Sequence, residues 1–450
     1  MAIKTDVQLL RKRRTKIVAT LGPASIDPPI ITSLITSGVD VFRLNMSHGD
    51  QASHAAVYHK VREAAQACGK PVAIMADLCG PKIRVGYFPS GGIDLVAGAK
   101  VVVTVRDVPG EPGLIPSQYG ALAADLRPGT RVLLADGVME LKVERIEHTE
   151  VHCEVMAGGF LTDRKGINLP DVQVSAPALT AKDRSDALFA LSLGVDFLAL
   201  SFVRTRGDLE ALRMLVDSHA ADAGLIAKIE RPEALEHIDD ILEASDAIMV
   251  ARGDLGVELP PEQVPAIQQQ LLDRARLHRR PVIIATQMLE SMIDNARPTR
   301  AEVTDVSHSV VVGADAVMLS AETAAGNYPV EATQMMDRIA RQAEAHLWRH
   351  EAFGTLAGDL REQADGVVDF GDAVARAMAT LSRDLKVRAV VVFSQSGTSA
   401  TTMSSARPAA PIVAVSSQAD TCRRVALCWG VLPEEVDVDD IEDKPTLSRQ

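Results

Sequence analysis

The chain contains few aromatic side chains: Phe, Trp and Tyr together make up 3% of its 450 residues. Its interior therefore has to be built from aliphatic side chains, and 47% of the chain is hydrophobic. Interiors rich in Val, Ile, Leu and Ala are typical of parallel β-sheets covered by helices. The length is too great for one ordinary domain, so we expect two or three.

Long apolar runs, paired cysteines and net positive charge are also missing. No apolar run reaches the ~18 residues of a membrane span, and the N-terminus has no apolar signal core. Five cysteines without a Cys-x-x-Cys pair are interpreted as free thiols of a reducing cytoplasm, the location we expect. A formal charge of −13 argues against nucleic acid as a partner, and the absence of a long apolar run argues against a membrane. The basic run Arg11–Arg14 is interpreted as a solvated helix face or a subunit contact rather than an RNA-binding patch.

Short apolar runs alternate with helical stretches along most of the chain. Eight such strand–helix units favour an α/β fold, the (β/α)₈ TIM barrel, over a doubly wound open sheet, which usually needs a glycine-rich turn after its first strand. The predicted strands are Lys16–Thr20, Val39–Leu44, Val72–Ala76, Asp196–Leu200, Gly224–Ile229, Ala247–Val250, Val282–Ala285 and Ala314–Leu319.

Two further domains are predicted. Alternating strands at 101–105, 131–134, 141–144 and 151–155, separated by Pro and Gly turns, indicate a small β-barrel domain inserted after the third barrel strand, where it can act as a lid. A polar linker (354–366), a helix (372–384), two strands (387–393 and 411–415) and an acidic tail (434–443) indicate a C-terminal α/β domain. The predicted boundaries are 1–14 for an N-terminal segment, 15–84 and 175–346 for the two parts of the barrel domain, 85–174 for the lid and 365–450 for the C-terminal domain.

Charged side chains follow the predicted barrel strands, at the ends where barrel enzymes carry their chemistry. Glu230 and Asp254 are a plausible carboxylate pair for Mg²⁺. The cations Arg43, Arg84 and Lys228 imply an anionic substrate, most simply a phosphate. A metal, a Lys and an Arg around one phosphoryl group favour phosphoryl transfer. Taken singly, each residue also has a structural reading: Glu230 as a helix cap or Arg252 in an ion pair.

Seven motifs, in the right order, resemble those of the pyruvate kinase family, and the resemblance covers the chain from about Lys12 to Gly430. The motifs are TKIVATLGPAS (15–25), FRLNMSHG (42–49), AKIE (227–230), IMVARGDLG (248–256), IATQMLESM (284–292), RPTRAE (297–302) and VMLSAETA (317–324). The resemblance implies a barrel with a lid and a C-terminal α/β domain, and transfer of the phosphoryl group of phosphoenolpyruvate to ADP, the last step of glycolysis. It further implies Mg²⁺ or Mn²⁺ as cofactor and a homotetramer as assembly.

The resemblance also implies a role for each matching residue. Lys228 would neutralise the phosphoryl group and the enolate, Arg43 would contact the phosphate, and Thr286 would lie near the enolate carbon that is protonated, either as donor or beside a donating water. Glu230 and Asp254 would hold the metal, and the Gly253–Asp254 backbone would bind the substrate carboxylate. The residues expected to attend the nucleotide are Asn45, His48, Arg84 and Lys165.

The segment 77–84 departs from the family pattern. Many members bind K⁺ and read Asp-Thr-Lys-Gly-Pro-Glu-Ile-Arg, whereas this chain reads Asp-Leu-Cys-Gly-Pro-Lys-Ile-Arg. Lys82 therefore replaces an anion by a cation, and its ammonium could stand where K⁺ would sit, so we expect that K⁺ is not required. The alternative is that Lys82 points to solvent. The monovalent-cation site, or its replacement, comprises Asn45, Ser47, Asp77, Leu78 and Lys82.

A second departure lies in the C-terminal domain. A loop resembles the sugar-phosphate loop of the family, with hydroxyls and a glycine at a helix N-terminus, and predicts a phosphorylated allosteric effector. Its residues are Ser394, Ser396, Gly397, Thr398 and Ser399. An ordinary helix cap is the alternative. The chain stops at Gln450, before the final strands and second effector loop that family members usually have, so we expect either a truncated chain or a shortened domain. Two rival functions stay open: a metal-dependent aldolase or lyase of the phosphoenolpyruvate/pyruvate barrel group, or a catalytically silent effector-binding relative.

Overall fold

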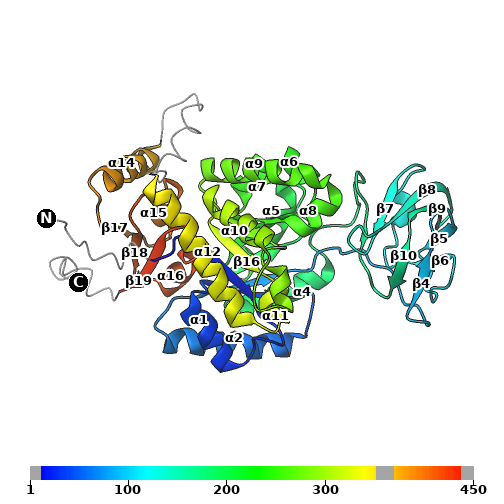
Figure 1. The fold of residues 1–450 in the computed structure, drawn as a ribbon, viewed down its shortest axis with the longest axis horizontal. Helices are drawn as coiled ribbons and strands as arrows, with labels where there is room; N and C mark the ends of the chain where they lie inside the picture. The colour runs from blue at the N-terminus through cyan, green and yellow to red at the C-terminus, as the bar shows by residue number, and fades with distance from the viewer. Residues whose placement is uncertain (1–11, 351–368, 437–450) are drawn as a thin grey trace.

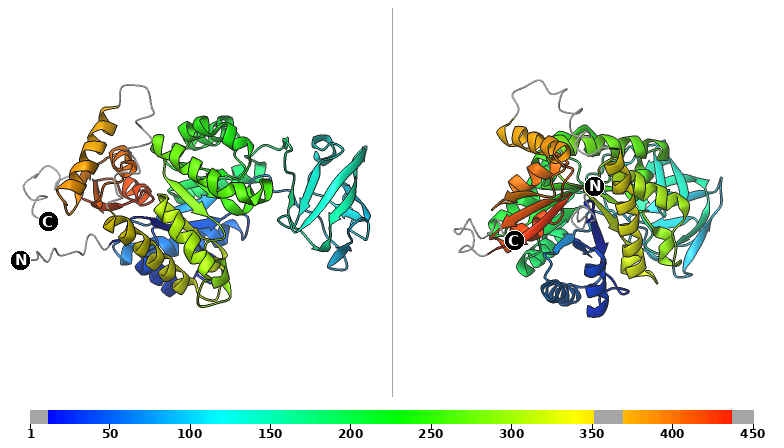
Figure 2. Two further views of the ribbon diagram at one scale, coloured as in Figure 1. Left: turned by 45° about the horizontal axis from the view of Figure 1, so that its top comes forward. Right: turned by 60° about the vertical axis from the view of Figure 1, so that its left-hand side comes forward.

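The computed structural model describes residues 12–350 and 369–436. A closed barrel of eight parallel strands forms its centre, with the inserted β domain at one end and the C-terminal domain at the other (Figures 1 and 2). The strand order around the barrel is β1-β16-β15-β14-β13-β12-β3-β2. The predicted fold class is confirmed, and each predicted barrel strand ends within two residues of the observed one. The bounds are β1 (Lys16–Thr20), β2 (Val41–Asn45), β3 (Ala73–Asp77), β12 (Phe197–Leu200), β13 (Gly224–Ile229), β14 (Ala247–Ala251), β15 (Val282–Ala285) and β16 (Ala316–Leu319).

The barrel strands form because their side chains are buried on both faces. Inward-facing residues such as Val18, Met75 and Ile226 make one cluster inside the barrel, and alternate residues such as Ile17 and Ile74 pack outward against the helices. The larger covering helices are α1 (Pro28–Ser37), α2 (Gln51–Ala67), α4 (Ala181–Leu193), α5 (Arg206–Ser218), α7 (Ile238–Ala244), α8 (Arg252–Glu258), α9 (Val264–Leu277), α10 (Arg300–Val311) and α12 (Pro329–Arg349). In the described ranges every helix is too short or too polar to cross a membrane.

The inserted domain is built from β-strands, as predicted. A six-stranded sheet of order β11-β7-β8-β9-β5-β6 and a two-stranded sheet, β10-β4, together form a curled, incomplete barrel. The bounds are β4 (Gly92–Leu95), β5 (Lys100–Thr104), β6 (Leu114–Pro116), β7 (Arg131–Leu134), β8 (Met139–Glu147), β9 (Glu150–Ala157), β10 (Gly159–Thr162) and β11 (Ile167–Asn168). The domain has an apolar core of its own, separate from that of the barrel.

The C-terminal domain is a parallel three-stranded sheet of order β17-β18-β19 with helices packed against it. The predicted helix and strands are present. The predicted start of the acidic tail is wrong, because Glu434 and Glu435 belong to β19, which pairs with β18. The rest of that tail and the predicted linker 354–366 lie outside the described residues. The bounds are α14 (Phe370–Asp384), β17 (Val390–Phe393), α15 (Thr398–Ser405), β18 (Ile412–Ser416), α16 (Ala419–Val425) and β19 (Val431–Glu435).

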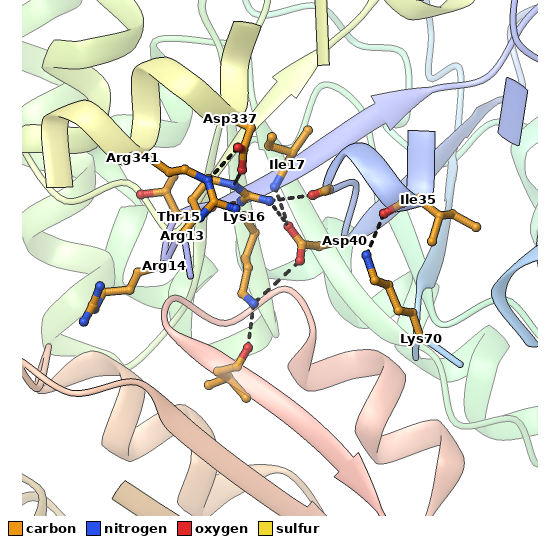
Figure 3. A network of polar contacts seen from close by, with 12 residues as sticks. Arg13, Arg14, Thr15, Lys16, Ile17, Ile35, Asp40, Lys70, Asp337 and Arg341 are labelled. Atoms are coloured by element: carbon orange, nitrogen blue, oxygen red, sulfur yellow. Dashed lines mark hydrogen bonds and ion pairs between the residues drawn. The ribbon is translucent and has the colours of Figure 1, made fainter. Parts of the chain in front are cut away.

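Two residues of the basic N-terminal run, Arg13 and Arg14, do not form a solvated helix face, while the alternative of a subunit contact stays a prediction. Arg13 contacts Asp40 and Asp337, each at 3.0 Å, and the Lys16 ammonium donates to the Val431 carbonyl of β19 at 2.6 Å (Figure 3). Arg14 is buried and donates to the Ala409 carbonyl at 2.7 Å; Arg11 lies outside the described ranges. The solvated-face prediction is wrong for Arg13 and Arg14 because half-buried carboxylates and a backbone carbonyl elsewhere in the chain receive their guanidinium groups. Arg14 and Lys16 join the N-terminal end of the barrel to the C-terminal domain, and Lys16 lines a cavity of about 1290 Å³ there.

Candidate active site

The C-terminal ends of β2, β3 and β13 bring three charged groups into direct contact. The carboxylate of Asp77 lies 2.6 Å from Arg43 Nε and 3.2 Å from Lys228 Nζ, and its side chain is 1% exposed. Burial alone would raise the pKa of Asp77, but Lys228 and Arg43 outweigh burial and hold it below its ordinary value. Asp77 is therefore a fixed anion that orients both cations toward the barrel mouth.

Lys228 is held by more than Asp77. Its ammonium contacts Glu230 Oε1 at 2.9 Å and donates to the Ser201 hydroxyl at 2.6 Å. Burial would lower the pKa of Lys228, yet the two carboxylates raise it above its ordinary value, so the side chain is charged. This geometry leaves little rotational freedom to the ammonium, which suits a group that stabilises charge on a bound substrate.

Glu230 is buried at the same strand end, and its second oxygen accepts the Phe202 N–H at 2.9 Å. Phe202 has φ 57°, a left-handed conformation uncommon for a bulky residue. Gly80 packs so closely on it that a Cβ at this glycine would lie 2.7 Å from the Phe202 ring. Burial raises the pKa of the Glu230 carboxyl, Lys228 lowers it and nearby Asp254 raises it again, which leaves the pKa above its ordinary value.

Thr286 and Gly253 meet where β15 and β14 end. The Gly253 N–H donates to Thr286 Oγ1 at 2.7 Å, and this hydroxyl donates to the Ala285 carbonyl at 2.6 Å. Thr286 and Gln287 both have positive φ, 67° and 54°, and two such residues in succession are a strain that the surrounding structure must hold in place. Arg252 supplies part of that support, because it donates to the Thr286 carbonyl at 2.7 Å. Arg252 also forms an ion pair with Asp305 at 2.7 Å, so its structural interpretation as a member of an ion pair is confirmed.

The remaining predicted site residues lie around the junction with the inserted domain. Lys82 and Asp254 line a cavity of about 40 Å³ together with residues 166–169 of the inserted domain. Arg84 donates to the Arg164 carbonyl at 2.9 Å, whereas Lys165 and His48 are exposed. In the part of the chain that the structure describes, no hydrogen bond or ion pair joins Arg84 or Lys165 to Asn45 or His48.

Two alternatives were stated for Lys82: its ammonium stands where K⁺ would sit, or it points to solvent. Lys82 is exposed, and the ion pairs of Asp77 within the described residues are with Arg43 and Lys228. Asn45 accepts the Ser47 N–H at 3.2 Å, and Leu78 is 1% exposed with no side-chain oxygen. Asp77 thus anchors the cations Arg43 and Lys228, a role that had not been predicted for it.

Two supporting residues were not among the predicted site residues. The Thr20 hydroxyl accepts a hydrogen bond from Arg43 at 3.2 Å. The Ser201 hydroxyl accepts one from the Lys228 ammonium and donates to the Leu78 carbonyl at 2.7 Å. Both stand at the C-terminal end of a barrel strand. Their position at strand ends could have marked them as site residues. Neither side chain carries charge, however, and Ser and Thr hydroxyls also occur as helix caps.

Charge of both signs is concentrated at the ends of neighbouring parallel strands and faces an inserted domain. This arrangement defines a (β/α)₈-barrel enzyme acting on a phosphorylated substrate. A family model described as pyruvate kinase, barrel domain, matches residues 12–333, and one described as pyruvate kinase, alpha/beta domain, matches residues 372–448. The chain belongs to the pyruvate kinase family.

Individual relatives agree with the family models. The chain is 44% identical over 422 residues to a pyruvate kinase of Agrobacterium vitis, covering 93% of this chain and 86% of that one. It is 43% identical over 427 residues to a pyruvate kinase of Geobacillus stearothermophilus, covering 94% and 72%. A crystal structure of a pyruvate kinase from Cryptosporidium parvum superposes with a TM-score of 0.91 at 34% identity, covering 99% and 92%. The chain transfers the phosphoryl group of phosphoenolpyruvate to ADP, and its family uses a divalent metal ion.

Proposed function

We propose that Lys228, Arg43 and Thr286 carry the reaction, with Glu230 and Asp254 as the ligands of the divalent ion. The observation that carries this proposal is the ammonium of Lys228, which three oxygen-bearing side chains fix at the barrel mouth. During transfer, negative charge spreads over the phosphoryl oxygens and the departing enolate. A preoriented ammonium and the Arg43 guanidinium stabilise that charge without having to reorganise.

The donor set fits Mg²⁺ or Mn²⁺. Mg²⁺ typically takes one or two protein carboxylates and completes its octahedron with water and substrate oxygens. Glu230 and Asp254 are close enough that Asp254 adds to the effect of burial in raising the pKa of the Glu230 carboxyl. A divalent ion between them would relieve that repulsion and would supply positive charge to the substrate oxygens.

Thr286 and the start of α8 are proposed to hold the acid part of the substrate. The Gly253–Asp254 backbone would receive the substrate carboxylate, and a Cβ on Gly253 would lie only 3.3 Å from Thr286 Oγ1, so a side chain here would crowd that approach. The Thr286 hydroxyl would then lie near the enolate carbon, where it or a water that it positions delivers the proton. Protonation of the enolate draws the transfer toward pyruvate.

The nucleotide is proposed to bind between the barrel and the inserted domain. Arg84 and Lys165 stand at the two ends of that domain, and Asn45 and His48 follow β2. Closure of the inserted domain would bring Arg84 and Lys165 to the ADP phosphates and exclude water, which would otherwise accept the phosphoryl group.

K⁺ is proposed to be unnecessary. Asp77 already contacts two cationic side chains within 3.2 Å, so a third cation beside it would be repelled. Leu78 offers no side-chain oxygen in place of the family's threonine. Lys82 is exposed, so we assign it a contribution to the positive potential of the mouth rather than a direct contact with Asp77.

A coupled assay of pyruvate formation tests the function and the cation proposal together. With Mg²⁺ and tetramethylammonium as the monovalent cation, pyruvate should appear from phosphoenolpyruvate only when ADP is present. Addition of KCl should leave the rate unchanged, with tetramethylammonium chloride at equal ionic strength as the control. Pyruvate formed without ADP would favour a lyase, and strong activation by K⁺ alone would remove the cation proposal.

A phosphorylated effector is proposed to bind the loop before α15. The N-cap residue Gly397 has φ 89° and no side chain caps the helix, which disfavours the simple helix-cap interpretation. The Ser394 hydroxyl is buried without a hydrogen-bond partner in the described residues, and the adjoining cavity of about 730 Å³ is also lined by Arg280. Titration with sugar phosphates and AMP should shift the phosphoenolpyruvate saturation curve to lower concentration; an unshifted curve would rule the effector out.

The chain is also proposed to assemble as a homotetramer. Sedimentation velocity measures the mass of the assembly and so tests this proposal.

A further inference from the structure

Asp196 lies at the opposite end of the barrel from the active site, immediately before β12. Its side chain is 2% exposed, and its two oxygens are shared between different partners. Oδ2 accepts the Ile74 N–H of β3 at 2.7 Å and contacts Arg62 of α2 at 2.7 Å. The other oxygen, Oδ1, receives Nε of Arg423 at 2.7 Å, and Arg423 belongs to α16 of the C-terminal domain.

The backbone of Asp196 joins three neighbouring strands at their starts. Its N–H donates to the Ile74 carbonyl of β3 at 2.9 Å, and its carbonyl accepts the Gly224 N–H of β13 at 3.0 Å. The C-terminal ends of the same three strands carry the active-site cluster. Strand β3 ends at Asp77, β12 is followed by Ser201, and β13 contains Lys228. Each of these strands is only four to six residues long, so a shift at the start is carried to the end over about 13–20 Å of stiff sheet.

Helix α16 also touches the effector loop. Thr421 is 2% exposed, and its hydroxyl donates to the Gln395 carbonyl at 2.6 Å. A Cβ on Gly397 would lie 3.0 Å from Val425 of the same helix. A continuous series of packed contacts thus leads from the loop through α16 to Arg423, and from there to Asp196.

We propose that Asp196 is a positioning residue for the phosphoryl transfer, and that Arg423 sets its position from the C-terminal domain. The ion pair holds β3, β12 and β13 in the register that brings Asp77 and Ser201 to the Lys228 ammonium. Without it, these strands keep their ladder hydrogen bonds, but the ammonium loses part of its fixed orientation. The inference rests on the proposed role of Lys228 and deepens it, because it names the contact by which the C-terminal domain reaches the catalytic group.

The test is Arg423→Met in the full chain, measured with saturating Mg²⁺. A small displacement of a positioned group can cost up to about 100-fold in rate, and we expect kcat to fall about tenfold. The KM values for phosphoenolpyruvate and ADP should stay nearly unchanged, because the orientation of the ammonium matters most in the transition state. Arg423→Lys should recover part of the loss, since an ammonium can still reach Asp196 Oδ1.

The matched control is Arg424→Met. Arg424 is the next residue of α16 and also forms an ion pair with the barrel, to Asp222 Oδ2 at 2.6 Å, but Asp222 is 78% exposed and lies in a loop. This variant should retain the wild-type kcat. A double-mutant cycle with Asp196→Asn completes the design. Asp196→Asn should be the slower single variant, because it also weakens the ion pair with Arg62, and adding Arg423→Met to it should lower kcat no further, because the Arg423–Asp196 ion pair is already lost.

The outcomes separate cleanly. A wild-type kcat for Arg423→Met, or an equal loss in Arg424→Met, would overturn the coupling, as would a loss of kcat accompanied by a matching fall in melting temperature. If Asp196→Asn does not fold, the comparison of the two arginine variants and the lysine rescue decides alone. If Lys228→Met is active, the proposed role of Lys228 is refuted. If Lys228→Met is inactive but Arg423→Met keeps the wild-type kcat, the role of Lys228 stands and only the coupling through Arg423 is refuted.

Discussion

Replacement of Lys228 by methionine should lower kcat by at least about 1,000-fold, the effect expected when a preorganised charge is removed from a phosphoryl-transfer site. Methionine keeps most of the length and apolar volume of the side chain but leaves no charge opposite the phosphoryl group. The Arg43 guanidinium and the divalent ion remain, so binding of phosphoenolpyruvate should weaken much less than kcat falls. Steady-state kinetics over the full range of both substrates separates the two effects.

The same substitution should also change stability. Asp77 keeps Arg43 as a partner, whereas the Glu230 oxygen that faced the ammonium at 2.9 Å loses it. A buried charge left without its partner costs about 3–5 kcal/mol, so the metal-free variant should melt at a lower temperature and saturating Mg²⁺ should recover much of the difference.

Lys100→Met is the matched control. Lys100 also stands between two carboxylates, Glu144 and Glu154, but on the surface of the inserted domain and 60% exposed. Exposed ion pairs contribute little to stability, so activity and melting temperature should both stay near wild type. A folded Lys228→Met enzyme that keeps a tenth or more of the wild-type kcat would show that this ammonium is not the charge that matters.

Much of the barrel could be predicted because its strands are short apolar runs that end in charge. A run such as Val282–Ala285 has no amphipathic alternation, and this is typical of parallel strands buried on both faces. Strand β19 escaped prediction because Pro433, Glu434 and Glu435 resemble the acidic tail that follows. Its place at the edge of the sheet explains why proline and charge are tolerated there.

The contacts between site residues were beyond prediction from the chain alone. That Asp77 lies beside Asn45 depends on the register between β2 and β3, and a shift by one residue would turn its carboxylate to the opposite face. Burial of Arg13 likewise depends on Asp337, which is 324 residues away in the sequence. Residue types at strand ends therefore identified the chemistry, whereas partners were fixed only by the closed barrel and the domains packed on its two ends.

Replacement of Glu230 by glutamine should raise the Mg²⁺ concentration for half-maximal activity by at least about 100-fold, because loss of even an outer-shell partner of a metal site costs up to that much. The glutamine oxygen can still accept the Phe202 N–H or the Lys228 ammonium, so the local fold should survive. What disappears is one of the two negative charges proposed to face the ion. Titration of Mn²⁺ followed by electron paramagnetic resonance measures the affinity independently of turnover.

Glu322→Gln separates a metal ligand from a carboxylate that is merely buried at the same barrel mouth. Glu322 is 3% exposed, follows β16, and accepts the backbone N–H groups of Leu289 and Ser320 at 3.1 and 2.7 Å. Burial raises the pKa of Glu322 as it does that of Glu230, but no ammonium contacts it in the described structure. Its substitution should leave the Mn²⁺ affinity unchanged. Equal losses of affinity in both variants would mean that general negative charge at the mouth holds the ion, and wild-type affinity in Glu230→Gln would remove Glu230 from the metal site.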